Sequence, residues 1–291
     1  MFLLTGMIIS SLSSCQDVVQ IKLDEGSKLY VIDAFVNNLG GTQTIRVTTN
    51  DSYFSNRQAP PVGNAQVKLE DLNSGKTYVF EYAGNGNYIY NVSAGDSMGI
   101  VNHQYRLNVT IDGSTYTSLT TQRRTAGIDS ISVVDISEGG FGPPPADTAK
   151  TYFCMLYAKD KVDQNTDYYW VKTFRNDTLF NGSADINISI DGTNGPVSDI
   201  AVDSIAFTPP ITFLGFKPYK KGNTCRVEIH SLSREGYYFF VQAAAQINNG
   251  GLFATTPENV KTNITTPSGA GTRAIGWFNM ASVASRSVAV P

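Results

Sequence analysis

The sequence predicts a mainly β protein, with an N-terminal immunoglobulin-like β-sandwich followed by a second β-rich unit that carries one C-terminal-region α-helix. Several segments alternate between apolar and polar residues, which indicates strands that are buried on one face. Turn residues recur at spacings of about ten residues, as in sandwiches. The chain of 291 residues contains 26 glycines and 15 tyrosines, a composition typical of short strands joined by many turns.

Residues 29–125 contain the clearest strands and form the predicted sandwich. In "AQVKLEDL", Val67 and Leu69 point inward while the intervening residues are polar. The segments "KLYVIDAFVNN" and "TQTIRVTTN" precede it, and "QYRLNVTIDG" follows with four apolar residues on one face. Residues that tolerate positive φ mark the hairpin turns, namely Asn73-Ser74-Gly75, Asn85-Gly86 and Asp112-Gly113.

Residues 126–291 form the predicted second unit, which begins after "RRTAGIDS". Its strands include "TYFCMLYAKD", "DYYWVKTFRND" and the alternating "ADINISIDG". The Gly- and Pro-rich segment "SEGGFGPPPADTAK" predicts a solvated loop. In the triplet Tyr168, Tyr169 and Trp170, aromatic rings could stack on sugars, but we expect one face of the triplet to be core.

One helix is predicted near residues 232–249. Ser231 or Ser233 can cap it, Glu235 suits its positive first turn, and Asn249-Gly250-Gly251 ends it. Apolar residues recur at helical spacing, and we expect this stripe to face the core. Its members are Tyr237, Phe240, Val241, Ala244 and Ile247.

The start of the chain predicts a lipid anchor. Residues 1–14 contain a short apolar run typical of a signal peptide. The sequence Leu12-Ser13-Ser14-Cys15 resembles the bacterial lipobox, which predicts lipid attachment at Cys15 and a lipidated tether over residues 15–28. The alternative is an ordinary cleaved signal with an incidental cysteine. Because no Lys or Arg precedes the apolar run, we expect the genomic reading frame to extend upstream.

Lipidation of Cys15 leaves two of the three cysteines, Cys154 and Cys225. Both lie in strand-like segments, where cysteines commonly pack as small buried hydrophobes. A disulfide between them is a second interpretation. A metal site is a third, although no CxxC spacing or His pair supports it.

The charge and the motifs exclude several functions. The net charge of -3 offers no basic face for nucleic acid. The two histidines, His103 and His230, lie in or beside strands, where surface or hydrogen-bonded structural roles are expected. No HExxH, GxSxG or P-loop motif is present. "DGTNG" at Asp191–Gly195 is interpreted as a turn rather than a calcium loop. We therefore predict no catalytic residues, no cofactor and no metal.

Several segments, in order, resemble a lipoprotein family of the Bacteroidota known as domain of unknown function 4249. They are "LYVIDAFVNN", "PPVGNAQVKLED", "YRLNVTIDGSTYTS", "SLSREGYYFFVQAAAQINNGGLFATTPENVKTNI" and "AIGWFNMASVASRSVAV". The resemblance implies an outer-membrane lipoprotein that acts beside a TonB-dependent receptor, and it supplies no catalytic residues. A strong acidic run after the lipidated cysteine is linked to export to the cell surface, and only Asp17 stands there in this chain. The side of the outer membrane on which the protein lies is therefore left open.

These inferences predict a non-enzymatic accessory or ligand-capturing partner of such a receptor, held at the outer membrane by its lipid. One alternative is a structural or adhesive cell-surface lipoprotein. Another is a hydrolase whose acidic residues are dispersed in sequence and meet only in the fold.

Overall fold

The structure is a computed structural model of the chain. It describes residues 27–52, 55, 57–93, 95–136, 151–159, 166–180, 182, 185–191, 218–249 and 260–291. The predicted signal peptide, Cys15 and the predicted loop at 137–150 lie outside these ranges. Residues 192–195 of the predicted turn also lie outside them.

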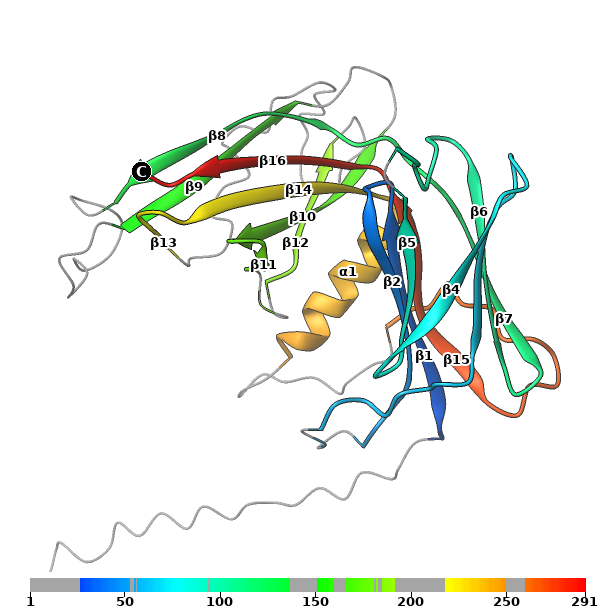
Figure 1. Ribbon diagram of the computed structural model, residues 1–291. Helices are drawn as coiled ribbons and strands as arrows, with labels where there is room; N and C mark the ends of the chain where they lie inside the picture. Colours follow the sequence, from blue (N-terminus) through cyan, green and yellow to red (C-terminus); the bar gives the residue numbers. More distant parts are fainter. Residues whose placement is uncertain are drawn as a thin grey trace, which may run out of the picture.

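Eight strands form the first sheet, in the order β15-β1-β2-β5-β4-β3-β6-β7 (Figure 1). Their bounds are Leu29–Asn37 (β1), Gly41–Thr49 (β2), Gln66–Asp71 (β3), Thr77–Gly84 (β4), Asn87–Val92 (β5), Gln104–Ile111 (β6), Ser114–Thr121 (β7) and Arg273–Ala281 (β15). Inward residues of the predicted strands are buried, among them Val67, Leu69 and Leu107. Asn85 and Asp112 have φ of 52° and 48°, so the two predicted Asx-Gly hairpin turns are confirmed.

The first sheet curls so that its two edges approach each other around one apolar core, in the manner of a sandwich. The hydroxyl of Tyr116 in β7 donates to the carbonyl of Thr272, just before β15, at 2.6 Å. Thr117 and Thr265 exchange backbone hydrogen bonds across the same seam.

The edge strand β15 belongs to residues 273–281, whereas the sequence placed the N-terminal sandwich within residues 29–125. It pairs in parallel with β1 from Leu29↔Arg273 to Asn37↔Ala281. A parallel pair requires a long crossover connection. The chain therefore completes the first sheet only after building most of the second lobe.

The second lobe contains two further sheets that share one apolar core. The strands of one are Asp167–Arg175 (β10), Thr178–Leu179 (β11), Asn187–Asp191 (β12), Thr224–Leu232 (β14) and Val283–Ala289 (β16). Those of the other are Gly127–Asp135 (β8), Thr151–Lys159 (β9) and Tyr219–Lys220 (β13). The mainly β class with one helix is thus confirmed.

The helix α1 spans Arg234–Ile247, within the predicted range. Ser233 caps it by accepting a hydrogen bond from the Gly236 amide at 3.0 Å. Phe240 is buried, but Val241 and Ile247 are 39% and 48% exposed. The prediction that the whole apolar stripe faces the core was therefore wrong for these two, because α1 contacts the sheets through a narrower face centred on Gly236 and Phe240.

A buried polar network lies where the chain passes between the lobes. Ser282 alone separates β15 from β16, and its amide donates to Ser231 Oγ at 2.8 Å. Ser231 in turn donates through its hydroxyl to the carbonyl of Arg123 at 2.9 Å, and Gln122 Nε2 donates to Ser282 Oγ at 3.0 Å. These bonds tie β7, β14 and β15 together at the junction. Within the described ranges, no helix has the length and apolar character needed to cross a bilayer.

Candidate functional site

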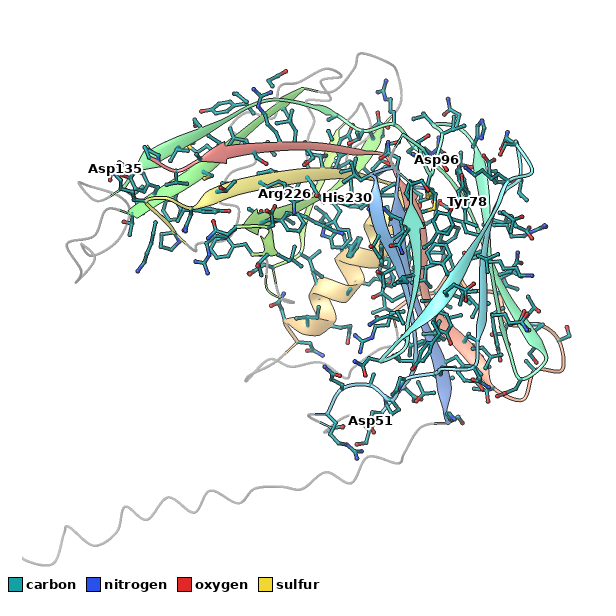
Figure 2. The ribbon with its side chains drawn as sticks, viewed as in Figure 1. Asp51, Tyr78, Asp96, Asp135, Arg226 and His230 are labelled. Carbon is teal, nitrogen blue, oxygen red and sulfur yellow. The ribbon has the colours of Figure 1, made fainter. Side chains whose placement is uncertain are left out.

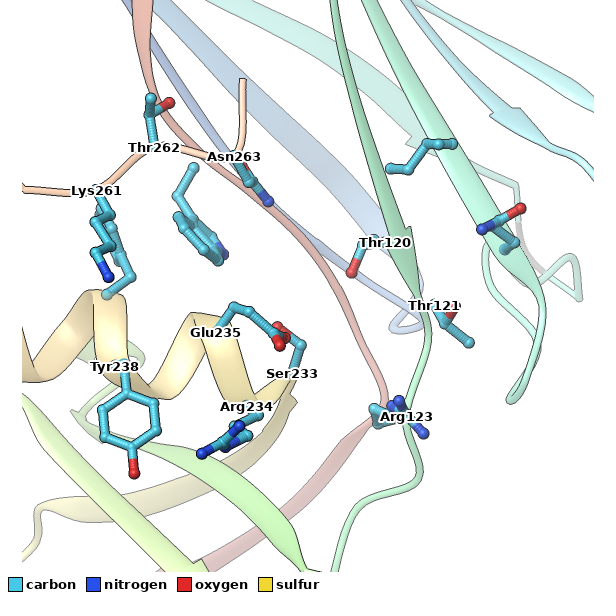
Figure 3. Close-up of a pocket in the computed structure, with 14 residues that line it drawn as sticks. Thr120, Thr121, Arg123, Ser233, Arg234, Glu235, Tyr238, Lys261, Thr262 and Asn263 are labelled. Atoms are coloured by element: carbon cyan, nitrogen blue, oxygen red, sulfur yellow. The ribbon is translucent and has the colours of Figure 1, made fainter. Parts of the chain in front are cut away.

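A cleft of about 610 Å³ opens between the first sheet and the start of α1; we call it the helix cleft (Figure 3). One wall comes from β7 and the residues after it, including Leu119, Thr121 and Arg123. The opposite wall comes from α1. α1 contributes Arg234, Glu235, Tyr238 and Phe239 to the lining. The segment before β15 contributes Lys261, and β15 itself contributes Trp277.

Three cations line the helix cleft, and only one acid accompanies them. Arg123, Arg234 and Lys261 are all exposed, and none makes an ion pair among the described residues. The Arg234 guanidinium lies 5.7 Å from the ring centroid of Tyr238, which orients it without neutralising it. Glu235 is the sole described carboxylate in the lining. The cleft is therefore positively charged in a protein whose net charge is negative.

A second hollow of about 590 Å³ lies on the other side of Phe239 and Trp277; we call it the sheet hollow. It separates β1 and β2 of the first sheet from β10 of the second lobe. Aromatic rings dominate its walls. Phe35 packs on Trp170 and Phe240 at centroid distances of 5.3 and 5.2 Å, and Trp170 packs on Phe240 at 4.6 Å.

Opposite charges face each other in the sheet hollow. Asp33 and Arg46 are cross-strand partners on β1 and β2, and Lys172 enters from β10. Asp33 is exposed at the mouth of the hollow, but protein surrounds its carboxyl on several sides. The resulting desolvation raises the pKa of Asp33, and the positive charges of Lys172 and Arg46 offset part of that rise. Burial lowers the pKa of Lys172 to about 8, against the opposing effects of Glu228 and Asp33. The Lys172 ammonium also lies 3.9 Å from the centroid of Trp170.

Glu228 on β14 extends this charged cluster, because it acts on Lys172. His230 lies two residues further along the same strand (Figure 2). His230 Nε2 lies 2.9 Å from Glu228 Oε2, and both residues are buried. Burial lowers the pKa of His230 to about 4, so its neutral ring donates to the carboxylate. Burial alone would raise the pKa of Glu228, but His230, Arg226 and Lys172 lower it overall. Arg226 also forms a short ion pair with Glu228.

Both histidines have structural partners, as the sequence predicted. His103 Nδ1 lies 2.8 Å from Oδ2 of Asp71, the last residue of β3. Burial would raise the pKa of Asp71, but hydrogen bonds from His103, Ser74 and two backbone amides lower it to about 2. Neither histidine lines the helix cleft or the sheet hollow.

Cys154 and Cys225 are free and buried. They lie side by side, and a hydrogen bond between the thiols, followed by burial, raises the pKa of Cys154. The same hydrogen bond lowers the pKa of Cys225, so a thiolate of this pair would reside on Cys225. Among the described residues, no group of three or more His, Cys, Asp or Glu side chains is placed to hold a metal ion.

The aromatic triplet divides as predicted, with Tyr169 fully buried and its neighbours half-buried. Trp170 lines the sheet hollow. The sequence interpretation missed the charged residues of both sites, Lys172 and Arg123 among them. The alternation of β10 carried a signal for Lys172, because it places Trp170 and Lys172 on the face opposite the buried Tyr169 and Val171.

These features define a mainly β protein with two lobes and an open, positively charged cleft beside its helix. The family described as Domain of unknown function (DUF4249) matches residues 16–287, and the chain belongs to this family. No curated protein matches the chain.

Among solved structures, the chain is similar to one described as "Structural insight into host cell surface retention of a 1.5-MDa bacterial ice-binding adhesin". The identity is 14% and the TM-score is 0.19, with 92% of this chain and 65% of that chain covered. The chain thus spans about 65% of the length of that protein.

Proposed function

We propose that this protein is an outer-membrane lipoprotein, anchored through Cys15, that acts without catalysis as an accessory or ligand-capturing partner of a TonB-dependent receptor. The observation that carries the proposal is the helix cleft, in which three cations that have no ion pair in the described part of the chain line an open space of about 610 Å³. Cavities of this size are typical of binding sites. Unpaired charge on an open surface supports recognition of an oppositely charged group from outside the chain.

The lining of the cleft favours binding over chemistry. Its described residues include no histidine and no cysteine, and Glu235 is the one carboxylate among them. Glycoside hydrolysis normally uses a pair of carboxyl groups that flank one bond, and the described lining supplies a single carboxyl.

The lipid anchor supports the same proposal by a physical argument. A protein tethered to the membrane stays close to any receptor in that membrane, so its effective concentration is high even when its intrinsic affinity is modest. A small interface at one cleft is then sufficient.

The test is to delete the gene, to restore either the wild-type or the Cys15→Ser form, and to measure receptor co-purification and uptake-dependent growth. We expect the wild-type form to bring down the receptor and restore growth, and the folded Cys15→Ser form to do neither. Mass spectrometry of the native amino-terminal peptide checks the lipid on Cys15. Full activity of the Cys15→Ser form with no receptor recovered would contradict the proposal.

A further inference from the structure

Part of the free edge of β7 carries backbone groups that have no partner among the described residues, and this part lies along the helix cleft. The hairpin between β6 and β7 turns at Asp112-Gly113. Ile111 and Ser114, which flank this two-residue turn, therefore exchange backbone hydrogen bonds with each other, and so does every second cross-strand pair away from the turn. The intervening residues of β7 therefore point their backbone groups away from β6. Thr117 does so, because its amide and carbonyl bond to Thr265.

Two further residues on this edge, Leu119 and Thr121, project their N–H and C=O groups in the same direction as Thr117. Neither residue has a partner for these groups among the described residues. The open stretch is limited to these two residues, because Thr117 pairs with Thr265 on one side and Arg123 bridges to Ala281 of β15 on the other. Both line the helix cleft, and Leu119 is 53% exposed. An edge with open donors and acceptors is a template for another strand.

The charge beside this edge selects the strand that it can accept. Arg123 follows Thr121 on the same chain segment, and Arg234 and Lys261 line the same space (Figure 3). Cations without ion pairs favour carboxylates on a ligand. Tyr238 and the exposed Leu119 offer apolar contact between the charges.

We propose that an extended, acidic segment of a partner protein binds in the helix cleft by adding as a strand to the edge of β7. This inference rests on the proposed function, because it specifies how the receptor or its complex would engage the cleft. Backbone pairing at Leu119 and Thr121 supplies the extended geometry, since open groups two residues apart match the repeat of a strand. Arg123, Arg234 and Lys261 supply the preference for acidic side chains.

The test is a calorimetric titration of the full chain with three synthetic peptides of about eight residues. The first alternates glutamate and valine, the second has glutamine for each glutamate, and the third is the acidic peptide with alternate backbone nitrogens methylated. We expect the acidic peptide to bind, and each of the others to bind at least about tenfold more weakly. Bound acidic peptide should slow amide hydrogen exchange at Leu119 and Thr121, but not at Thr115, which also faces away from β6.

Protein variants test the same contacts. Arg123→Gln combined with Arg234→Gln should weaken binding of the acidic peptide by about tenfold or more, whereas Lys68→Gln on the exposed face of β3 should leave it unchanged. Leu119→Pro removes one outward amide without removing a β6–β7 bond, and should abolish binding. Thr115→Pro is its matched control. If Leu119→Pro fails to fold, the methylated peptide tests the same hydrogen bonds on the unaltered protein.

Equal binding of the methylated and unmethylated peptides would overturn strand addition, and equal binding of the glutamine peptide would overturn the role of charge. Binding of benzoate or anionic lipid vesicles in the cleft, without binding of the acidic peptide, would also overturn the inference. These assays need neither anchor nor receptor. If the receptor co-purifies but no peptide binds, strand addition is wrong and the proposed function stands. If the acidic peptide binds but no receptor co-purifies, the proposed function is wrong and strand addition stands.

Discussion

The helix cleft and the sheet hollow lie on either side of Phe239 and Trp277, yet they balance their charges in opposite ways. In the sheet hollow, Asp33 faces Arg46 and Lys172, and Lys172 is also within the influence of Glu228. In the helix cleft, three cations accompany one glutamate, so positive charge is in excess among the described residues.

This difference separates a structural role from a binding role. Charges of opposite sign within one chain stabilise each other, and removing the buried Glu228, which is ion-paired with Arg226, leaves its cationic neighbours uncompensated at a high energetic cost. Charges on an open surface contribute little to stability. We therefore propose that the sheet hollow joins the two lobes and that the helix cleft receives an external partner. Four changes test the assignment through the free energy of unfolding.

The largest effect is expected from Phe240→Ala. Phe240 is buried and contacts the rings of Phe35 and Trp170, so it joins β1, β10 and α1. We expect a loss of about 4 kcal/mol in urea unfolding, from lost burial and the remaining cavity. The neighbouring Val241→Ala, on the exposed face of α1, should change stability by no more than about 0.5 kcal/mol. Equal effects would show that the aromatic contact does not join the lobes.

A somewhat smaller loss, of about 3 kcal/mol, is expected from Glu228→Gln, because Arg226 and Lys172 then lose their buried counter-charge. Glu70→Gln is the matched control. It breaks the exposed Arg106–Glu70 pair and should cost less than about 1 kcal/mol. A Glu228→Gln protein as stable as the control would mean that the hollow does not depend on charge balance.

Acid should weaken the sheet hollow through His230. In the unfolded chain the pKa of His230 is about 6.5, the ordinary value for histidine, whereas in the folded protein burial lowers it to about 4. The unfolded state thus holds more protons between these values, and stability falls as the pH is lowered through that window. Between pH 7 and 5 we expect His230 to account for a loss of about 2 kcal/mol.

The measurement for this effect is urea unfolding of wild type and His230→Gln at both pH values. The variant lacks the titrating ring, so its stability should fall less between pH 7 and 5. Parallel declines in the two proteins would contradict the assignment, because they would place the titration elsewhere than beside Glu228 and Lys172.

The smallest effect is expected in the helix cleft. Lys261→Gln and Arg234→Gln remove exposed cations that have no ion-pair partner in the described part of the chain, so each should change stability by no more than about 0.5 kcal/mol. Thermal unfolding of the two variants at low and high salt checks this. A loss above about 2 kcal/mol in either would mean that the cleft serves the fold.

Local sequence patterns predicted the strands and hairpins of the first sheet well, because burial and turn geometry act over a few residues. The alternation in β3 and the positive φ of Asn85 and Asp112 are examples. The helix was predicted by its serine cap and spacing. Its buried face was not, because the periodicity of Val241 and Ile247 does not reveal how much of α1 the sheets cover.

Long-range pairing was beyond these patterns. Nothing near residues 273–281 marks β15 as the parallel partner of β1, since that choice depends on the crossover as a whole. The two sites were missed for the same reason. Arg123, Arg234 and Lys261 come from three distant segments, and they become one cleft only when β7, α1 and β15 are assembled.

The most direct test of the central claim is receptor co-purification from native membranes with a protein that keeps the whole N-terminal segment and carries both Arg123→Gln and Arg234→Gln. The comparison is with a Lys68→Gln protein expressed in the same way. We expect the Lys68→Gln protein to recover its receptor as wild type does, and the equally stable double variant to recover little or none. Equal recovery by the two would contradict the claim that the helix cleft is the partner site.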